Sequence, residues 1–300
     1  MFVITGATGN TGRVVAESLL SRGQKVRVLG RNAPKLAPLA AKGAEAFPAD
    51  VLDVQALTKA FTGADAVYLL VPRDINTPDV IAHYDRVSEA YVAAIKASGV
   101  KYAVTLSSVG ANLTSGSGPV LGLHRMEERI NTIPHLNVVH LRPGAFMENN
   151  LAQISIIQRF GNMAGVIKAS TPFAQIATKD IGAAAAELLV RRDFTGKSTR
   201  ELLGQRDLSM NEAAKIIGAA IGKPGLAYTE APVPMFTAGL QQAGFSANLA
   251  ELFAEMSLSI GSGVMKHEEP RTAANTTPTS FETFAAEVFA PAFRGAAASA

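Results

Sequence analysis

The chain has 300 residues, of which 48% are hydrophobic and 18% charged, and its net charge is +3 at neutral pH. This composition allows a large core and excludes disorder over most of the chain. It contains no cysteine, which excludes disulfides, thiolate catalysis and cysteine-ligated metal sites.

The charge pattern and the apolar pattern also limit the partners and the compartment. No run of Lys or Arg exceeds two residues, so we expect neither nucleic acid nor a membrane surface as a partner. No apolar run approaches the roughly 20 residues that span a bilayer. A signal peptide is not expected either, because a glycine motif begins five residues into the chain. We therefore expect a cytoplasmic protein with a small-molecule substrate.

Short apolar runs alternate with helical stretches over the first 145 residues. The spacing of apolar residues predicts helices over residues 11–22 and 83–98. The β-branched runs predict strands over residues 2–5, 25–29, 44–47, 66–71, 103–106 and 136–141. This alternation predicts an α/β fold with a Rossmann-like, doubly wound parallel sheet. We assign residues 1–146 to this dinucleotide-binding domain.

The alternation ends after Phe146, and we assign residues 147–300 to a smaller, mostly helical substrate-binding part that need not fold alone. The sequence Ser209 to Glu212 predicts a capping box that opens a helix through Ala220. Residues 279–282 predict the start of another helix, which would bury Phe284, Val288 and Phe289. Residues 295–300 are small and Ala-rich, and we expect them to fray.

The stretch TGATGNTGR, residues 5–13, lies between the first predicted strand and the first predicted helix. Glycines in such a turn let a diphosphate approach the backbone, and the free N–H groups of the helix N-terminus attract it. The turn therefore predicts a dinucleotide site, with a plain flexible turn as the alternative. The cofactor-binding candidates here are Gly6, Thr8, Gly9, Asn10, Thr11 and Gly12.

Residues after the next three strands favour one dinucleotide over the other. Arg31 stands where a site for NAD carries an acidic residue, and Lys35 follows one helical turn later. Because guanidinium groups clamp phosphates, we expect NADP(H) to be preferred over NAD(H), unless Arg31 is simply a solvated side chain. Asp50, with Val51, is a candidate for the adenine, although Asp50 is also a good helix N-cap. An apolar wall is expected from Leu70, Val71 and Pro72.

Six stretches in the expected order over nearly the whole chain resemble the NmrA-like branch of the atypical short-chain dehydrogenases/reductases. They are VITGATGNTGR, VRVLGRN, LSSVGA, HLRPGAFMENN, KDIGAAAAELL and RTAANTTPTSFETFAAE. The resemblance implies an NAD(P)H-dependent reductase of quinones or azo dyes, or a protein that binds the dinucleotide and acts as a redox-sensing regulator.

The chain departs from the Tyr-x-x-x-Lys pair of the wider superfamily, in which the tyrosine passes a proton to the substrate. None of the five tyrosines has a lysine four residues later. Alignment of VLGLHRMEE with the superfamily pattern places Val120 at the tyrosine, His124 at the lysine and Glu128 at the glutamate that follows. His124 then has three interpretations, which are a general acid, a ligand of the nicotinamide ribose and an ordinary half-buried helix histidine.

The remaining site candidates follow the fifth and sixth predicted strands. Ser107 and Ser108 are candidates to position a substrate carbonyl, with Ser107 also near the cofactor, or else they only cap the turn. The resemblance implies that a loop lies over the nicotinamide and that the residues after it approach the substrate. The loop is Pro143, Gly144, Ala145 and Phe146, and the substrate candidates are Phe146, Met147 and Asn149, with Glu148 nearby. The alternative for the loop is a rigid connection.

These patterns lead to two functional hypotheses. The first is an NADPH-dependent oxidoreductase that transfers hydride to a flat, apolar acceptor such as a quinone or an azo compound, which needs less help from a dedicated proton donor. The second is a non-catalytic NADP(H)-sensing regulator of a partner protein. A homodimer is compatible with both, and no metal site is recognised among the histidines.

Overall fold

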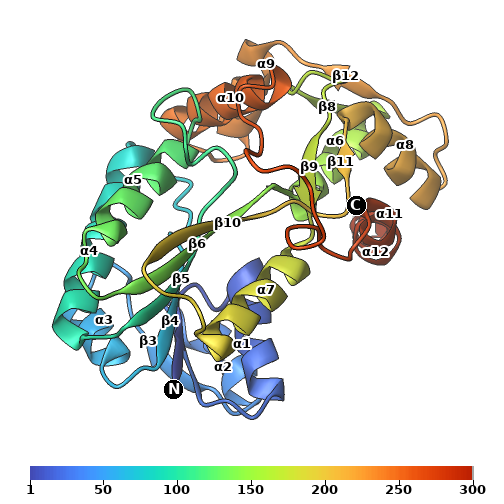
Figure 1. The fold of residues 1–300 in the computed structure, drawn as a ribbon. Coiled ribbons are helices and arrows are strands. Elements are labelled where there is room, and N and C mark those ends of the chain that lie inside the picture. The colour runs from blue at the N-terminus through green and yellow to red at the C-terminus, as the bar shows by residue number, and fades with distance from the viewer. Residues whose placement is uncertain (299–300) are drawn as a thin grey trace.

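A seven-stranded parallel sheet forms the centre of the molecule, and the computed structural model describes residues 1–298 of the chain. The strand order is β10-β6-β5-β4-β1-β2-β3. Figure 1 shows the strands twisted between two layers of helices. The strands are β1 Phe2–Ile4, β2 Val26–Gly30, β3 Glu45–Pro48, β4 Ala66–Leu69, β5 Tyr102–Leu106, β6 Asn137–Pro143 and β10 Lys197–Leu202. The predicted doubly wound Rossmann-like sheet is confirmed.

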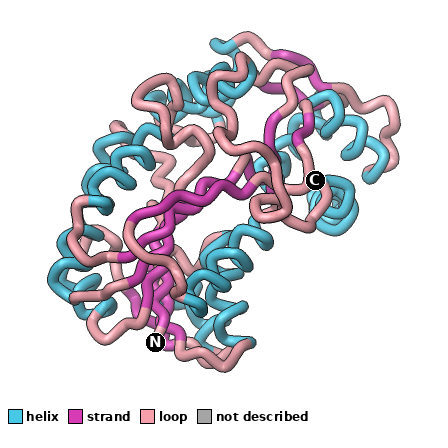
Figure 2. The backbone as a smooth tube through the Cα atoms, viewed as in Figure 1, coloured by secondary structure: helices cyan, strands magenta, loops and turns pink. Residues whose placement is uncertain are grey.

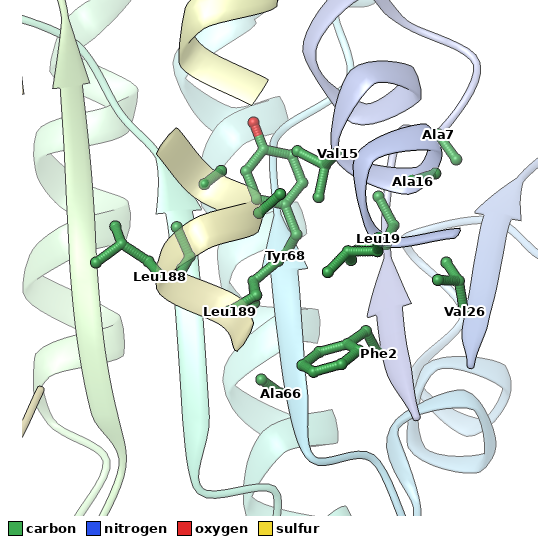
Figure 3. Close-up of a cluster of buried hydrophobic side chains, with 14 of the residues drawn as sticks. Phe2, Ala7, Val15, Ala16, Leu19, Val26, Ala66, Tyr68, Leu188 and Leu189 are labelled. Atoms are coloured by element: carbon green, nitrogen blue, oxygen red, sulfur yellow. The ribbon is translucent and has the colours of Figure 1, made fainter. Parts of the chain in front are cut away.

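Helices cover both faces of this sheet because its strands are apolar on both sides. One face carries α1 (Asn10–Ser21), α2 (Ala33–Ala40) and α7 (Thr178–Arg191), and the other α3 (Val54–Phe61), α4 (Val80–Ser98) and α5 (Val120–Asn131). Figure 3 shows side chains that fill the first interface, among them Phe2, Tyr68, Val15, Leu19, Leu188 and Leu189. Each face therefore has its own apolar core.

The smaller part of the chain lies beyond the carboxyl ends of the strands and contains strands as well as helices (Figure 2). Its three-stranded sheet has the order β11-β9-β7 and its two-stranded sheet pairs β12 with β8. These strands are β7 Ala145–Phe146, β8 Met163–Gly165, β9 Phe173–Ile176, β11 Asp207–Leu208 and β12 Tyr228–Glu230. The helices are η1 Met147–Ala152, α6 Gln153–Phe160, α8 Met210–Ala220, α9 Val233–Gln242, α10 Ala247–Gly261, α11 Phe281–Phe284, η2 Ala285–Phe289 and α12 Ala290–Ala298. The part is mostly helical, as predicted.

The chain returns to the large sheet after it has begun the smaller part. α7 packs on α1, where Gly182 allows the close approach, because a Cβ atom at this position would lie 2.6 Å from the Cβ of Val14. β10 then pairs in parallel with β6, from Lys197 to Leu202. The division at residues 146 and 147 is therefore not a boundary of the sheet, since α7 and β10 belong to its layers. That the smaller part need not fold alone stays a prediction.

The C-terminal helices agree with the sequence only in part. Ser209 and Glu212 form the predicted capping box of α8. Phe284 and Phe289 are buried, but Val288 is 38% exposed, so its predicted burial is wrong. The expected fraying is also wrong up to residue 298, because α12 continues to Ala298, and the last two residues lie outside the described part.

Two carboxylates attach the smaller part to the sheet layers. Asp180, in the first turn of α7, accepts hydrogen bonds from the N–H and the hydroxyl of Thr279, at 3.0 and 2.8 Å. Glu148, in η1, accepts from the N–H of Thr178 at 3.0 Å and from its hydroxyl at 2.6 Å. Both carboxylates lie at the N-terminus of α7, where the helix dipole favours negative charge. These bonds position the smaller part over the sheet edge.

A buried histidine, His140, lies in β6 directly opposite Thr105 of the neighbouring strand β5. His140 is 1% exposed, and its ring nitrogens lie 2.8 Å from Thr105 Oγ1 and 3.0 Å from Asn131 Oδ1. Burial lowers the pKa of His140 to about 4, although the negative charge of Glu127 opposes the shift. The side chain is therefore neutral in the folded protein at neutral pH.

The lowered pKa of His140 predicts a pH dependence of stability. The unfolded chain binds a proton at His140 below about pH 6.5, whereas the folded chain binds it only near pH 4. The free energy of unfolding should therefore fall as the pH is lowered from 6.5 to 4, by up to about 3 kcal/mol from this group. Urea denaturation measured at several pH values checks this, with His140→Gln as the control for titrating carboxylates. Equal pH slopes for the two proteins would contradict the assignment.

Candidate functional site

The glycine turn holds helix α1 directly on the end of β1. A Cβ atom at Gly12 would lie 2.3 Å from the carbonyl oxygen of Gly6, so only glycine allows this approach. Gly6 itself has φ +59°, which favours glycine, and a Cβ atom there would lie 2.6 Å from a methyl group of Leu70. The first and third glycines therefore have structural reasons that are independent of any ligand.

The middle glycine leaves the N-terminus of α1 open. Gly9 is the N-cap residue and has no side chain with which to cap the helix, and Asn10, Thr11 and Gly12 form the first turn without an acidic residue. A Cβ atom at Gly9 would meet only Gly6 O within 4 Å, at 3.3 Å. Uncapped N–H groups with an accessible approach are the usual environment of a bound phosphate. Thr8, whose methyl group would lie 3.7 Å from a Cβ atom at Gly30, connects this turn to the end of β2.

Two cations follow the end of β2, close in the chain to Gly30. Arg31 and Lys35 are exposed, and neither forms an ion pair within residues 1–298. Asn32 caps α2 by accepting a hydrogen bond from the N–H of Lys35. The Arg31 side chain is therefore available for an anionic ligand beside the glycine turn.

Asp50 lies in the turn after β3 and not at the start of a helix. It accepts a hydrogen bond from the N–H of Leu52 at 2.9 Å, whereas Asp53 is the N-cap of α3. Val51 packs against the core of the second face. The helix-cap alternative for Asp50 is therefore replaced by a turn, and its contact with an adenine stays a prediction.

A cavity of about 400 Å³ opens between the carboxyl ends of β4, β5 and β6 and the smaller part. From the predicted site, Leu70, Val71, Ser107, Ser108, Gly144, Ala145, Phe146 and Asn149 line it. α5 adds Val120 and Leu123, β9 adds Phe173 and Ala174, and α10 adds Phe253, Met256 and Ile260. Its size is that of a small-molecule site, and its walls are mainly apolar.

A buried ion pair fixes the serine at the end of β5. Glu127, in α5, is 4% exposed and accepts two hydrogen bonds from Arg142, Nη2 to Oε2 at 2.6 Å and Nε to Oε1 at 3.0 Å. Ser107 Oγ donates to the same carboxylate at 2.5 Å, and Ser108 Oγ donates to the carbonyl oxygen of Val109 at 2.8 Å. Both serine protons are therefore committed to protein acceptors.

Several predicted residues lie outside the described cavity wall. His124 Nδ1 lies 2.8 Å from the carbonyl oxygen of Ala111, and its Nε2 lies 3.5 Å from Glu128. This arrangement matches the ordinary helix histidine among the three interpretations. Met147 is 1% exposed and belongs to the core of the smaller part.

The two prolines of the predicted site also lie behind the wall. The carbonyl oxygen of Pro72 faces His83 Nε2 at 3.0 Å, and Pro143 pairs with Leu202 at the end of β6. Roles of His124, Met147, Pro72 and Pro143 toward a ligand stay predictions that the geometry does not favour.

The glutamate chosen by alignment is not the buried one. The Glu128 side chain is 67% exposed, whereas Glu127 forms the ion pair behind Ser107. The helical pattern of α5 contains the signal, since Leu123, Met126, Glu127 and Ile130 share the face that packs on the sheet.

Sequence reasoning missed the wall that comes from α10 and from α4. Phe253, Met256 and Ile260 have the i, i+3, i+7 spacing of one helix face, a signal that does not tell which surface the face covers. Tyr84, at the start of α4, and Arg73, before it, also line the cavity. Their contribution depends on tertiary packing that no local pattern predicts.

The polar end of the cavity is formed by Asp207, Lys266 and His267. His267 Nδ1 lies 2.6 Å from the carbonyl oxygen of Glu269, and its Nε2 lies 3.3 Å from Asp207 Oδ2. The carboxylate of Glu201 holds this segment by accepting from two successive backbone N–H groups, those of residues 268 and 269.

Two kinds of site are not found in the described part of the chain. Residues 1–298 contain no group of three or more His, Asp or Glu side chains that is suited to a metal ion. None of the helices within these residues is long and apolar enough to cross a lipid bilayer.

Comparisons with known proteins agree with this architecture. The chain is 28% identical over 270 residues to quinone oxidoreductase 2 of Escherichia coli strain K12. The aligned region covers 88% of this chain and 89% of that protein. It is 29% identical over 227 residues to a (4-alkanoyl-5-oxo-2,5-dihydrofuran-3-yl)methyl phosphate reductase of Streptomyces griseus. The aligned region covers 75% of each of the two chains.

A crystal structure of an NADPH-dependent quinone oxidoreductase of Escherichia coli, in complex with NADPH, superposes with a TM-score of 0.83 at 25% identity. The superposition covers 96% of this chain and 100% of that chain. The sequence profile of the NmrA-like family matches residues 1–284, from the glycine turn through α11. The protein with this turn, sheet and cavity therefore belongs to the NmrA-like family.

Proposed function

We propose that the protein is an NADPH-dependent oxidoreductase that reduces a flat, apolar acceptor such as a quinone or an azo compound. One observation carries the proposal: the phosphate-binding type of turn and the apolar cavity share a wall. The Leu70 side chain contacts Gly6 of the turn and also lines the cavity. A dinucleotide held at the turn is thus continuous with a space for a second small molecule.

The residues around the turn fit NADPH. The uncapped first turn of α1 suits the diphosphate, and Arg31, with no ion-pair partner among the described residues, suits a 2′-phosphate. NAD(H) lacks that phosphate and is the less favoured cofactor. The relatives are in accord, since one solved structure is an NADPH complex, one relative is named a quinone oxidoreductase and another is named a reductase of a dihydrofuranyl-methyl phosphate.

The cavity determines the kind of acceptor. When it is bound, NADPH supplies the hydride. The protein supplies apolar walls such as Phe146, Val120 and Phe173, which exclude water and hold a flat molecule in place. One observation favours the alternative of a non-catalytic sensor. The expected proton donors are not free, because His124 lies outside the cavity wall and the hydroxyls of Ser107 and Ser108 already donate to protein acceptors. Localisation in the cytoplasm and assembly as a homodimer stay predictions.

The reductase proposal is tested directly by turnover. The purified protein mixed with NADPH and a panel of quinones and azo dyes should lower the absorbance at the nicotinamide band. Simple aldehydes and ketones, which NADPH reduces in ordinary alcohol dehydrogenases, serve as control acceptors, for which no turnover is expected. Tight NADPH binding without turnover of any acceptor would contradict the reductase and support the sensor.

Replacing Arg31 with Ala tests the choice of cofactor. We expect NADPH to bind roughly tenfold to a hundredfold more weakly, because a charge-assisted contact with the 2′-phosphate is lost, and NADH binding to change little. Calorimetric titration of both nucleotides measures this. Arg191→Ala is the matched control, since Arg191 is exposed and pairs only with Asp193 in the described chain. Equal losses for the two nucleotides would show that Arg31 does not read the phosphate.

Alanine variants at two glycines of the turn distinguish an effect on NADPH binding from an effect on folding. Gly9→Ala should weaken NADPH binding by roughly tenfold and lower the thermal unfolding temperature only slightly, because the added methyl group would meet only Gly6 O within 4 Å, at 3.3 Å. Gly12→Ala should lower the unfolding temperature as well, because its methyl group would collide with Gly6 O. Gly239→Ala, in α9 with nothing within 4 Å of an added Cβ, is the control. Unchanged affinity of the Gly9 variant would argue against the site.

A further inference from the structure

The cavity wall contains a phenol whose hydroxyl has no protein partner. Tyr84 lines the cavity, and no hydrogen bond joins its hydroxyl to any residue of the described chain. In residues 1–298, the side-chain oxygen and nitrogen atoms that are buried without a hydrogen-bond partner are Ser117 Oγ, Ser259 Oγ and Thr277 Oγ1. Tyr84 Oη has no partner and is not one of them, so this oxygen is not fully buried. It is therefore accessible from one of the two cavities that Tyr84 lines, which are the cavity described above and a smaller one of about 70 Å³ beside His83 and Pro119.

The ring of Tyr84 is held in place by the packing of α4 against α5. A Cβ atom at Gly122 would lie 2.6 Å from the Cβ, Cγ and Cδ1 atoms of Tyr84, so the base of the ring rests directly on this glycine. Val120, two residues earlier in α5, lines the same cavity. A tyrosine from the neighbouring helix thus lines the same cavity as the residue that stands in place of the superfamily tyrosine.

The surroundings keep this hydroxyl protonated and leave a cation near it. Burial raises the pKa of Tyr84, and the positive charge of Arg73 opposes the shift. Arg73 lines the cavity as well, and its guanidinium lies 5.6 Å from the centre of the Phe253 ring. A phenol near neutral pH is therefore a donor, and a phenolate formed after proton loss has a nearby positive charge.

Four other polar side chains of the described wall, two serines, a histidine and an asparagine, are less suited to donate a proton. The hydroxyls of Ser107 and Ser108 donate to Glu127 and to a carbonyl oxygen. Both ring nitrogens of His267 face protein oxygens. The amide of Asn149 donates hydrogen bonds but does not release a proton.

We propose that Tyr84 is the proton donor to the acceptor bound in the cavity, an inference that rests on the proposed reductase function. The acceptor gains a hydride, which is two electrons and one proton, from NADPH and becomes an anion. Tyr84 Oη gives its proton to the anionic oxygen or nitrogen, and the phenolate regains a proton from water. The phenol thereby takes over the task that Val120 cannot perform.

The test compares Tyr84→Phe with the intact protein, using NADPH with 1,4-naphthoquinone and with the azo dye methyl red. The variant keeps the ring on Gly122 and removes only the hydroxyl. We expect kcat to fall on the order of tenfold to a hundredfold, with a KM for the acceptor that rises no more than the fivefold to tenfold loss of its affinity and with an unchanged affinity for NADPH. Tyr102→Phe is the matched control, because its ring packs on Phe194 outside the described cavity wall.

A binding measurement does not depend on turnover. Calorimetric titration of 1,4-naphthoquinone without NADPH should show an affinity roughly fivefold to tenfold lower in Tyr84→Phe, because one hydrogen bond is lost. If the intact protein reduces either compound and the variant matches it in kcat and in quinone affinity, the Tyr84 assignment is overturned and the reductase stands. If the intact protein neither reduces nor binds the compounds, both proposals are overturned.

Discussion

The contact between the N-terminus of α1 and the turn before it determines the rest of the arrangement. The Cα atom of Gly12 faces the carbonyl oxygen of Gly6, and there is no space for a Cβ atom between them. This contact directs the uncapped end of α1 toward the carboxyl edge of the sheet. Gly182 then lets α7 pack closely on α1, and the N-terminus of α7 holds Glu148 and Asp180. A series of close helix contacts thereby connects the phosphate-binding turn to the smaller part.

The smaller part closes the sheet edge into a mainly apolar cavity. Glu127 and Arg142 pair behind Ser107, where loss of either partner would leave a buried charge without compensation. The arrangement makes the serine a rigid part of the wall. α10 contributes an apolar helix face opposite the sheet. The protein thus offers position and water exclusion more than a set of charged catalytic groups.

The order of strands and helices was predictable because periodicity is a local property. The strand runs, the glycine turn and the capping box of Ser209 each carry their signal within a few residues. Of the expected site residues, Leu70 and Ser107 line the cavity because they directly follow parallel strands, and their roles toward a ligand stay predictions. The part that Tyr84 and the α10 face have in the wall was not predicted, because it depends on how helices distant in the sequence pack together. Alignment with the superfamily motif drew attention to Glu128 and not to the buried Glu127, since alignment by one motif ignores which helix face meets the sheet.

A crystal structure of the protein soaked with NADPH tests the central claim most directly. The account predicts the diphosphate on the N–H groups of Asn10 to Gly12, the 2′-phosphate beside Arg31 and the nicotinamide in the cavity lined by Ser107 and Phe146. A nucleotide bound elsewhere on the molecule, or a saturating soak that leaves the turn without a phosphate, would contradict it.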